Sequence, residues 1–390
     1  MSQVQNSGWC TSSYQQTVAF GIPMADALVE AAARFSARRI ALMTTNSLAG
    51  PGQLAGRVAE VLGTRLHSVI SGIRPHTPRG DVARIVQALE GADGVVTIGG
   101  SSVGDTVKAA RLWLANGVSN PEGMDGRLFP YNKLAGTRPD AVQKPSLPFI
   151  SIPTTLSAGE FTSGAGITDE RGPVKQVFVY PGMAPDIVIL DPEMTRATPN
   201  GLFFSTGFRA VDHALETWCS INPTPMSDAY SLHAARLLIT SLLQVFDEPE
   251  NLAARLNCQI GAWLSILGPA DGVQAGGSHG IGHALGGTAG MPHGETSCVM
   301  LPHVLRFNAA FNGERQAVIS AAVGQPGTPL ADIVENLVKH LGLPGRLRDA
   351  KVSEAVLDKV AEAALHDHFL LANPVPMSLE VIKDLLRKAW

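Results

Sequence analysis

The sequence lacks paired cysteines, a long apolar segment and a secretory leader, and each absence excludes a class of protein. The four cysteines (Cys10, Cys219, Cys258 and Cys298) are far apart and form no C-x-x-C pair, which indicates a reduced, cytoplasmic protein without a disulfide framework. No segment is long and apolar enough to cross a bilayer. The start lacks the basic and apolar regions of a signal peptide. We therefore expect a protein with no membrane partner.

The chain also lacks a large excess of either positive or negative charge. The chain has 30 lysines and arginines against 34 aspartates and glutamates, a formal net charge of -4, and no basic run. Such a chain offers little to a nucleic-acid backbone, so we expect a small-molecule partner instead. At 390 residues, 45% of them hydrophobic, it is longer than one core usually supports, and two domains are expected.

The first half alternates short apolar strands with segments of helical spacing. This alternation predicts a doubly wound parallel sheet in a domain covering residues 1–195. After an irregular start, helices are expected over Pro23–Ala37, Gln53–Leu62 and Gly80–Leu89, and strands over Arg39–Thr45, Leu66–Ile70, the residues from Gly94, Leu147–Thr155 and Pro185–Pro192.

The turn after the strand that begins at Gly94 is the first chemical signal. Gly99, Gly100, Ser101 and Ser102 come where a helix would begin, and backbone N–H groups there suit a pyrophosphate. Asp105 follows on the same helix. The turn is not the G-x-G-x-x-G fingerprint, and many such turns contain glycine only to allow a positive φ.

Two later segments of the first half carry polar groups. Thr154 and Thr155 follow a strand, where doubly wound sheets bind ligands, although ordinary helix capping explains such hydroxyls equally well. Lys175 lies in a polar stretch and could be a solvated charge. Residues 116–144, rich in glycine, proline and charge, suggest a surface loop or lid.

From Pro199 onward the strand pattern ends. Helical spacing over Phe203–Ser220, Asp228–Phe246 and Leu252–Leu267 predicts an all-α domain covering residues 196–390. The crevice between two such domains is the default expectation for a site.

Histidines gather in this second half. His279 and His283 are spaced i, i+4 and so share a helix face, His293 follows shortly, and His213 precedes them. Imidazoles in this arrangement suit a metal site or proton transfer. The plainer interpretation is a glycine-rich segment whose histidines satisfy backbone groups, but four converging imidazoles favour a site.

The motifs, taken in order, resemble the iron-containing (group III) alcohol dehydrogenase family over nearly the whole chain. The resemblance is carried by the glycine turn from Gly99, by Ile152 to Thr155, by the run from Val188 to Pro192, by Gly207-x5-His-Ala-x-Glu and by His279-x3-His-x9-His-Gly. Within it the chain is most similar to maleylacetate reductases, through His76-Thr-Pro and Asn373-Pro-Val-Pro. The excursion over 116–144 departs from that branch.

The resemblance implies a Rossmann-like domain with NAD or NADP bound at the Gly99–Ser102 turn. It also implies that Thr154 and Thr155 approach the cofactor, that Lys175 lies near its ribose, and that the protein is a homodimer. Ser101 stands where the family has a third glycine. Residues 43–46 include no acidic side chain to select between the ribose 2′-hydroxyl and a 2′-phosphate, so use of both cofactors is expected.

Metal-dependent members of the family hold iron or zinc with an aspartate and three histidines. The histidines match His213, His279 and His293, but Arg209 occupies the aspartate position. A guanidinium has fixed positive charge and no lone pair, so it cannot bind a cation. We therefore expect a site without a catalytic metal. A salt bridge between Arg209 and Asp212 is the structural alternative for the arginine.

The resulting hypothesis is NAD(P)H-dependent reduction of an unsaturated or carbonyl-bearing acid, as in a maleylacetate reductase. Arg209, His213, His279 and His293 would stabilise the developing oxyanion, and Arg209 would also bind a substrate carboxylate. His283 matches the family histidine that faces the nicotinamide and is expected to donate or relay the proton. The alternatives are a metal-dependent alcohol dehydrogenase, a lyase or cyclase with recycled NAD like the dehydroquinate synthases, and a paralogue that only binds nucleotide.

Overall fold

The computed structural model describes residues 8–11, 16–50, 52–125, 128, 142–172 and 174–390. The chain forms two compact units. One comprises residues 1–155 and 159–198, and the other comprises residues 199–390 together with the short segment 156–158.

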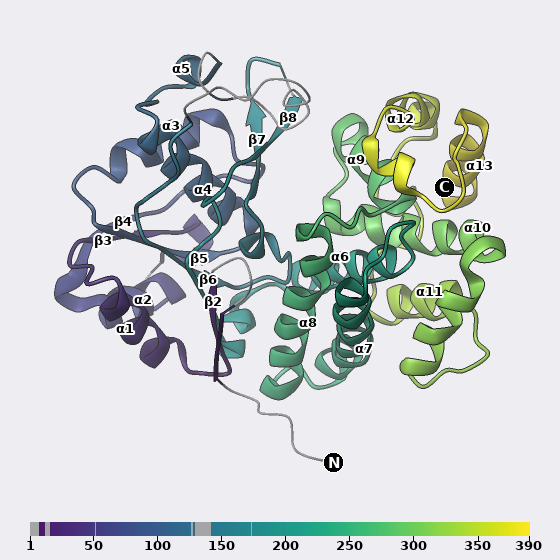
Figure 1. Cartoon of the computed structure of the whole chain (residues 1–390), viewed down its shortest axis with the longest axis horizontal. Coiled ribbons are helices and arrows are strands. Elements are labelled where there is room, and N and C mark those ends of the chain that lie inside the picture. Colours follow the sequence, from purple (N-terminus) through teal and green to yellow (C-terminus); the bar gives the residue numbers. More distant parts are fainter. Residues whose placement is uncertain (1–7, 12–15, 51, 126–127, 129–141, 173) are drawn as a thin grey trace. The chain divides into compact units, whose positions relative to one another are not determined.

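The first unit is built on a seven-stranded sheet in the order β1-β2-β9-β6-β5-β3-β4 (Figure 1). Six of these strands run parallel, and β1 alone pairs antiparallel, with β2. The strands are β1 Gly8–Thr11, β2 Thr17–Phe20, β3 Ile40–Met43, β4 Leu66–Ile70, β5 Gly94–Gly99, β6 Phe149–Pro153 and β9 Ile187–Leu190. The parallel sheet predicted from the alternating pattern is confirmed.

The central strands are buried on both faces because helices cover both sides, which explains their continuous apolar runs. Successive side chains alternate between two cores. Leu42 and Val96 pack with the helices α1 and α2, while Met43 and Val95 pack with α3 and α4. These helices span α1 Met24–Arg34, α2 Leu54–Leu62, α3 Arg79–Ala88 and α4 Ser101–Ala115.

Two parts of the first unit differ from the prediction. Within the segment expected to be irregular, the described residues form β1 and β2, and β2 joins the main sheet beside β9. The strands β7 Gly164–Asp169 and β8 Val174–Val179 form a separate antiparallel ribbon that the alternating pattern did not reveal. Of the expected lid, only a short helix, α5 Pro121–Asp125, and its flanks are described, and residues 129–141 lie outside the described part.

The second unit is helical, as expected. Its helices are α6 Asn200–Trp218, α7 Pro225–Asp247, α8 Leu252–Ala270, α9 Gly277–Ala289, α10 His293–Ala322, α11 Leu330–His340, α12 Leu357–Ala364 and α13 Leu379–Ala389, with a short 3-10 helix, η7, at His368–Ala372. The helix α6 contacts α7, α8 and α10 and is buried along most of its length. This burial places its polar residues inside the unit.

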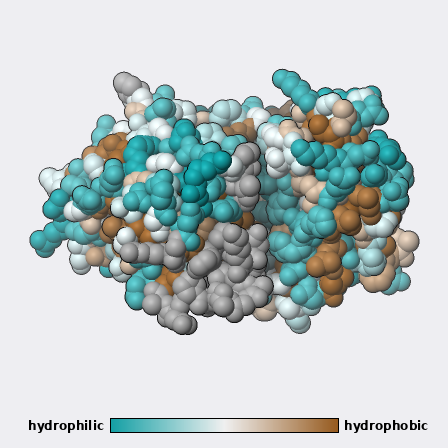
Figure 2. Space-filling model, turned by 90° about the horizontal axis from the view of Figure 1, so that it is seen from above, coloured by the Kyte–Doolittle hydropathy of each residue, from teal (hydrophilic) through white to brown (hydrophobic). Residues whose placement is uncertain are grey.

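Among the described residues, no helix is both long enough and apolar enough to cross a bilayer. On the face drawn in Figure 2, hydrophilic residues cover much of each unit and apolar residues lie between them.

Candidate active site

The glycine turn joins β5 to α4 and takes a conformation that glycine permits. Gly99 has φ of +149°, and a Cβ there would lie 2.9 Å from Cγ2 of Val103. A Cβ on Gly100 would lie 3.1 Å from the Thr155 side chain. The helix α4 begins at Ser101, and no side chain of the described residues caps its first turn. Uncapped N–H groups at the start of a helix suit an anion.

The segment after β6 is fixed against this turn. The Thr154 N–H donates to the Gly99 carbonyl at 3.0 Å, and the Thr198 hydroxyl donates to the Thr154 carbonyl at 2.7 Å. Both Thr154 and Thr155 are buried. The structure therefore brings the predicted glycine turn and the two threonines together. Lys175 lies in β8 in register with Thr168, and its side chain is outside the described part.

Both carboxylate oxygens of Asp105 accept hydrogen bonds from the protein itself. Its Oδ1 accepts a hydrogen bond from Nζ of Lys108 at 3.2 Å, and its Oδ2 accepts one from the N–H of Gly166 at 3.1 Å. Lys108 is completely buried and also donates to the carbonyls of Gly159 and Gly164. These contacts tie α4, whose first turn follows the glycine turn, to the β7–β8 ribbon.

Four polar residues of α6 form the centre of the second unit's candidate site: Arg209, Asp212, His213 and Glu216. Their spacing of i, i+3, i+4 and i+7 places them on one helical face. Asp212, His213 and Glu216 are buried, and the Arg209 side chain is 12% exposed. Buried charges are costly unless they are paired, so their partners decide what each one does.

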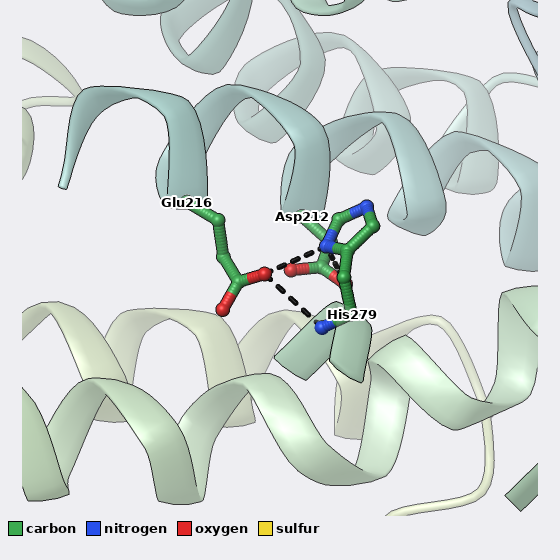
Figure 3. A group of neighbouring side chains, drawn as sticks. All are labelled: Asp212, Glu216 and His279. Carbon is green, nitrogen blue, oxygen red and sulfur yellow. Dashed lines mark hydrogen bonds and ion pairs between the residues drawn. The ribbon is translucent and has the colours of Figure 1, made fainter. Parts of the chain in front are cut away.

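Glu216 binds the first turn of α9. Its two carboxylate oxygens accept hydrogen bonds from the N–H groups of Gly276, Ser278 and His279 at 2.7–3.1 Å, and Oε2 also accepts one from Nδ1 of His279 at 2.7 Å. Figure 3 shows Glu216 and Asp212 extending from one helix toward His279. The N–H of Gly277 donates to Oδ1 of Asn373 instead. The N–H groups at the start of α9 thus donate hydrogen bonds to a carboxylate and an amide side chain.

The contact with Glu216 fixes the tautomer of His279. Because the Nδ1 proton is donated to Glu216, the Nε2 atom of a neutral ring carries a lone pair. Burial lowers the pKa of His279 to about 3, and the charge of Arg209 acts in the same direction. His279 is therefore neutral near pH 7. Its Nε2 is buried without a hydrogen-bond partner among the described residues, so a bound ligand could occupy it.

Arg209 and Asp212 form an ion pair, with Nη1 of the arginine 3.4 Å from Oδ2 of the aspartate. The same Nη1 donates to Oγ of Ser297 at 2.8 Å. Oδ2 of Asp212 also accepts the hydroxyls of Ser297 and Ser278, at 2.5 and 2.9 Å. Burial lowers the pKa of Arg209 and raises that of Asp212, and each charge opposes the shift of the other. The salt bridge with Asp212 that the sequence offered as the structural alternative for Arg209 is therefore present.

The remaining imidazoles lie close by. The rings of His213 and His279 are 5.0 Å apart between centroids, and those of His283 and His293 are 5.6 Å apart. Burial and the neighbouring positive charges lower the pKa of His213 well below its usual value. Nδ1 of His283 lies 3.0 Å from Oδ2 of Asp367. The structure therefore gathers all five residues expected for catalysis within one unit.

The donor set can be tested for a divalent cation. His279 has the arrangement of a metal-binding imidazole, with a carboxylate on Nδ1 and a vacant Nε2. Within the described part of the chain, however, the one group of histidine, cysteine or acidic donors whose ligand atoms all lie within 4.8 Å is Asp212, Glu216 and His279. Four N–H groups already occupy the oxygens of Glu216. The imidazoles of His213, His279 and His293 do not form such a group, and Arg209 adds a cation. The one donor group of this kind therefore has its glutamate already engaged and the Arg209 cation beside it.

Residue spacing alone missed several groups that shape this site, namely Glu216, Ser278, Ser297 and Asp367. Glu216 was visible as the glutamate of the His-Ala-x-Glu motif, but its role depends on a helix 60 residues later in the chain. Asp367 gave no signal, because one aspartate near the end of a chain is ordinary. Ser278 and Ser297 stood beside predicted histidines, at positions where small polar residues usually only cap helices.

Comparison with family models matches both halves of the chain. Residues 15–192 match the model described as iron-containing alcohol dehydrogenase. Residues 203–390 match the model described as Fe-containing alcohol dehydrogenase family, C-terminal.

Individual relatives are similar over comparable lengths. The dehydrogenase FUM7 of Gibberella moniliformis is 32% identical over 410 aligned residues, which cover 95% of each chain. The lactaldehyde reductase of Escherichia coli is 32% identical over 77% of this chain and 78% of its own. The crystal structure of maleylacetate reductase from Agrobacterium tumefaciens superposes with a TM-score of 0.80 at 27% identity, covering 99% of both chains.

Proposed function

Because the chain belongs to the iron-containing alcohol dehydrogenase family and is an oxidoreductase, we propose that it uses NADH or NADPH to reduce a carbonyl-bearing or unsaturated carboxylic acid without a catalytic metal. The observation that carries this proposal is the largely buried Arg209, which is paired with Asp212 and stands where the resemblance places the family's aspartate ligand. The similarity to a maleylacetate reductase supports the substrate class.

The dinucleotide is proposed to bind at the turn Gly99, Gly100, Ser101 and Ser102. The uncapped start of α4 supports this, because N–H groups at a helix N-terminus favour a pyrophosphate. Residues 44–46, which follow β3, include no acidic side chain that could bind the ribose of the cofactor. The Thr44 hydroxyl donates to the Ile98 carbonyl at 2.9 Å. This segment offers no means of distinguishing NADH from NADPH, so both are expected to serve.

The glycine turn can be tested with Gly99→Ala. At φ of +149° and 2.9 Å from Val103, the new methyl group would displace the turn, so NADH affinity is expected to fall by at least about tenfold, or roughly 1.4 kcal/mol. Calorimetric titration with NADH would measure this. Gly56→Ala is the matched control, because an added Cβ meets nothing within 4 Å there and the helix α2 favours alanine. Unchanged affinity in Gly99→Ala would move the cofactor site elsewhere.

In the proposed reaction, the glycine turn would hold the reduced cofactor, which would supply a hydride to the substrate carbon. For a carbonyl substrate, the π electron pair would move to oxygen, and His283 would donate a proton from Nε2 to complete the alcohol. For a conjugated alkene, hydride adds to the β-carbon and the proton to the α-carbon. In both cases NAD(P)+ is released and His283 regains a proton from solvent. Arg209 supplies positive charge to the developing anion.

The other imidazoles take a different role in this proposal. Neutral His279, with its proton committed to Glu216, can only accept a hydrogen bond at Nε2. It would bind a hydroxyl or enol of the ligand and would not donate to an oxyanion. Nδ1 of His213 is also buried without a partner in the described part of the chain. Together these nitrogens provide a polar lining for an oxygen-rich small acid.

Arg209→Ala tests the substrate class. Removal of the guanidinium is expected to lower kcat/KM for oxo and enoic acids by about ten- to a hundredfold, the value of one or two charged hydrogen bonds. The measurement is NADH and NADPH oxidation across a panel of such acids and matched aldehydes, with and without chelator. Arg209→Lys, which keeps the charge but loses the planar fork, serves as the paired variant. Full activity of Arg209→Ala on acids would remove the arginine from the mechanism.

The same assay separates the alternatives. A lyase or cyclase that recycles NAD would turn over without net change in nicotinamide absorbance. A metal-dependent dehydrogenase would lose activity with chelator and recover it with iron or zinc. That the protein is a cytoplasmic homodimer stays a prediction, and sedimentation analysis would test the dimer.

A further inference from the structure

We propose that Asp367 is a positioning residue for His283, which holds the imidazole proton on Nδ1 and thereby leaves Nε2 as the atom that exchanges a proton with the ligand. This inference rests on the proposed function, in which His283 is the proton donor. The carboxylate oxygen Oδ2 lies 3.0 Å from Nδ1 of His283. At that distance an ionised carboxylate can only accept, so Nδ1 must carry the hydrogen.

The position of Asp367 is itself fixed. Its other oxygen, Oδ1, accepts a hydrogen bond from the N–H of Phe369 at 2.9 Å and so caps the short helix η7. The Phe369 ring in turn contacts His283 and His279, at centroid distances of 5.2 and 5.9 Å. One tight turn therefore sets both the orientation of the imidazole and its tautomer. This turn comes 84 residues after His283 in the chain.

Two imidazoles of α9, His279 and His283, are paired with carboxylates, and the two pairs differ in solvent access. His279 and Glu216 are both buried, and the imidazole is held neutral. The His283 side chain is 34% exposed. Burial alone would raise the pKa of Asp367, but its contacts with His283 lower it below the usual range, so the carboxylate is ionised at neutral pH. The exposed part of the His283 side chain leaves it open to proton exchange with solvent.

The alternative is that Asp367 acts only as a helix cap. Asp367→Asn distinguishes the two roles, because asparagine caps helices as well as aspartate does. With its oxygen on the Phe369 N–H, the asparagine amide would present a donor to Nδ1 of His283. The imidazole must then accept at Nδ1 and carry its proton on Nε2. Asn251→Ala is the matched control, since Asn251 caps α8 in the same unit through Ala254 and is not bonded to an imidazole.

The first measurement is ¹⁵N NMR of histidine-labelled full-length protein, with the His283 signals assigned through His283→Gln. The native protein is expected to show the hydrogen on Nδ1, and Asp367→Asn is expected to show it on Nε2. A native ring with its hydrogen on Nε2, or an unchanged tautomer in Asp367→Asn, would overturn the proposal. This measurement needs no substrate, so it tests the tautomer of His283 independently of the proposed reaction.

The second measurement is steady-state kinetics with the best acid found in the cofactor-oxidation screen. Asp367→Asn is expected to lower kcat by on the order of 10²-fold, with KM and the dissociation constant of NADH nearly unchanged. Asn251→Ala should lower the melting temperature but leave kcat as in the native protein. If Asp367→Asn changed only the melting temperature, Asp367 would be a cap and the proposal would fail.

Discussion

Arg209→Asp is expected to convert the helical unit into one that retains one divalent cation per chain after dialysis, whereas the native protein retains none. The native cluster contains one largely buried cation, Arg209, and two buried carboxylates, Asp212 and Glu216. The substitution replaces the cation by a third carboxylate beside an imidazole whose Nε2 is vacant. Each unit of charge a few ångströms from a divalent ion contributes several kcal/mol at an effective dielectric near 20. The affinity for zinc should therefore rise by more than about 10³-fold.

Elemental analysis and calorimetric titration with zinc would measure this change. Arg209→Gln is the matched control, because it removes the positive charge without adding a ligand, and it should retain less than one metal per chain. A native protein with a stoichiometric, activity-linked metal would contradict the metal-free proposal directly. If Arg209→Asp retained no cation, the arginine would not be what prevents metal binding.

Glu216→Gln is expected to lower the free energy of unfolding by at least about 3 kcal/mol, more than any other substitution proposed for this protein. The carboxylate accepts four N–H groups, three of them from the start of α9. An amide has one acceptor oxygen, and its NH₂ group would face N–H donors that cannot reach water. Losing hydrogen bonds to a buried charged group costs roughly 1.5–3 kcal/mol each. Urea denaturation followed by circular dichroism would measure the loss.

Glu30→Gln provides the comparison for Glu216→Gln. Glu30 forms an exposed i, i+4 pair with Arg34 on α1, and such pairs contribute about 0.3–0.5 kcal/mol. A similar small effect for Glu216→Gln would mean that the start of α9 is held by other contacts, such as that between Gly277 and Asn373.

The fold was predictable because its signals are local. The strands β3, β5, β6 and β9 are continuous apolar runs next to helical spacing, and this pattern alone predicts a parallel sheet covered on both faces. The β7–β8 ribbon was missed because glycines and charges interrupt its alternation. Its pairing depends on contacts with α4 through Asp105 and Lys108, which no window of sequence reveals.

The candidate site was predictable in its residue types but not in its connections. Histidine spacing and the arginine at position 209 identified the cluster, and the Arg209–Asp212 pair followed from i, i+3 spacing on one helix. Which nitrogen of His279 or His283 carries the proton could not be predicted. That property is set by Glu216 and Asp367, which are 63 and 84 residues away along the chain.

The pairing of Arg209 with Asp212 also has a kinetic consequence. Long-range attraction of an anion depends on the summed charge of the region it approaches, and here the guanidinium is offset by Asp212 at 3.4 Å and by the buried Glu216 nearby. A dianionic acid therefore gains little speed of encounter from this cluster. Selectivity among acids would then arise from differences in the dissociation rate of the bound acid. Ionic strength should change the association rate only slightly.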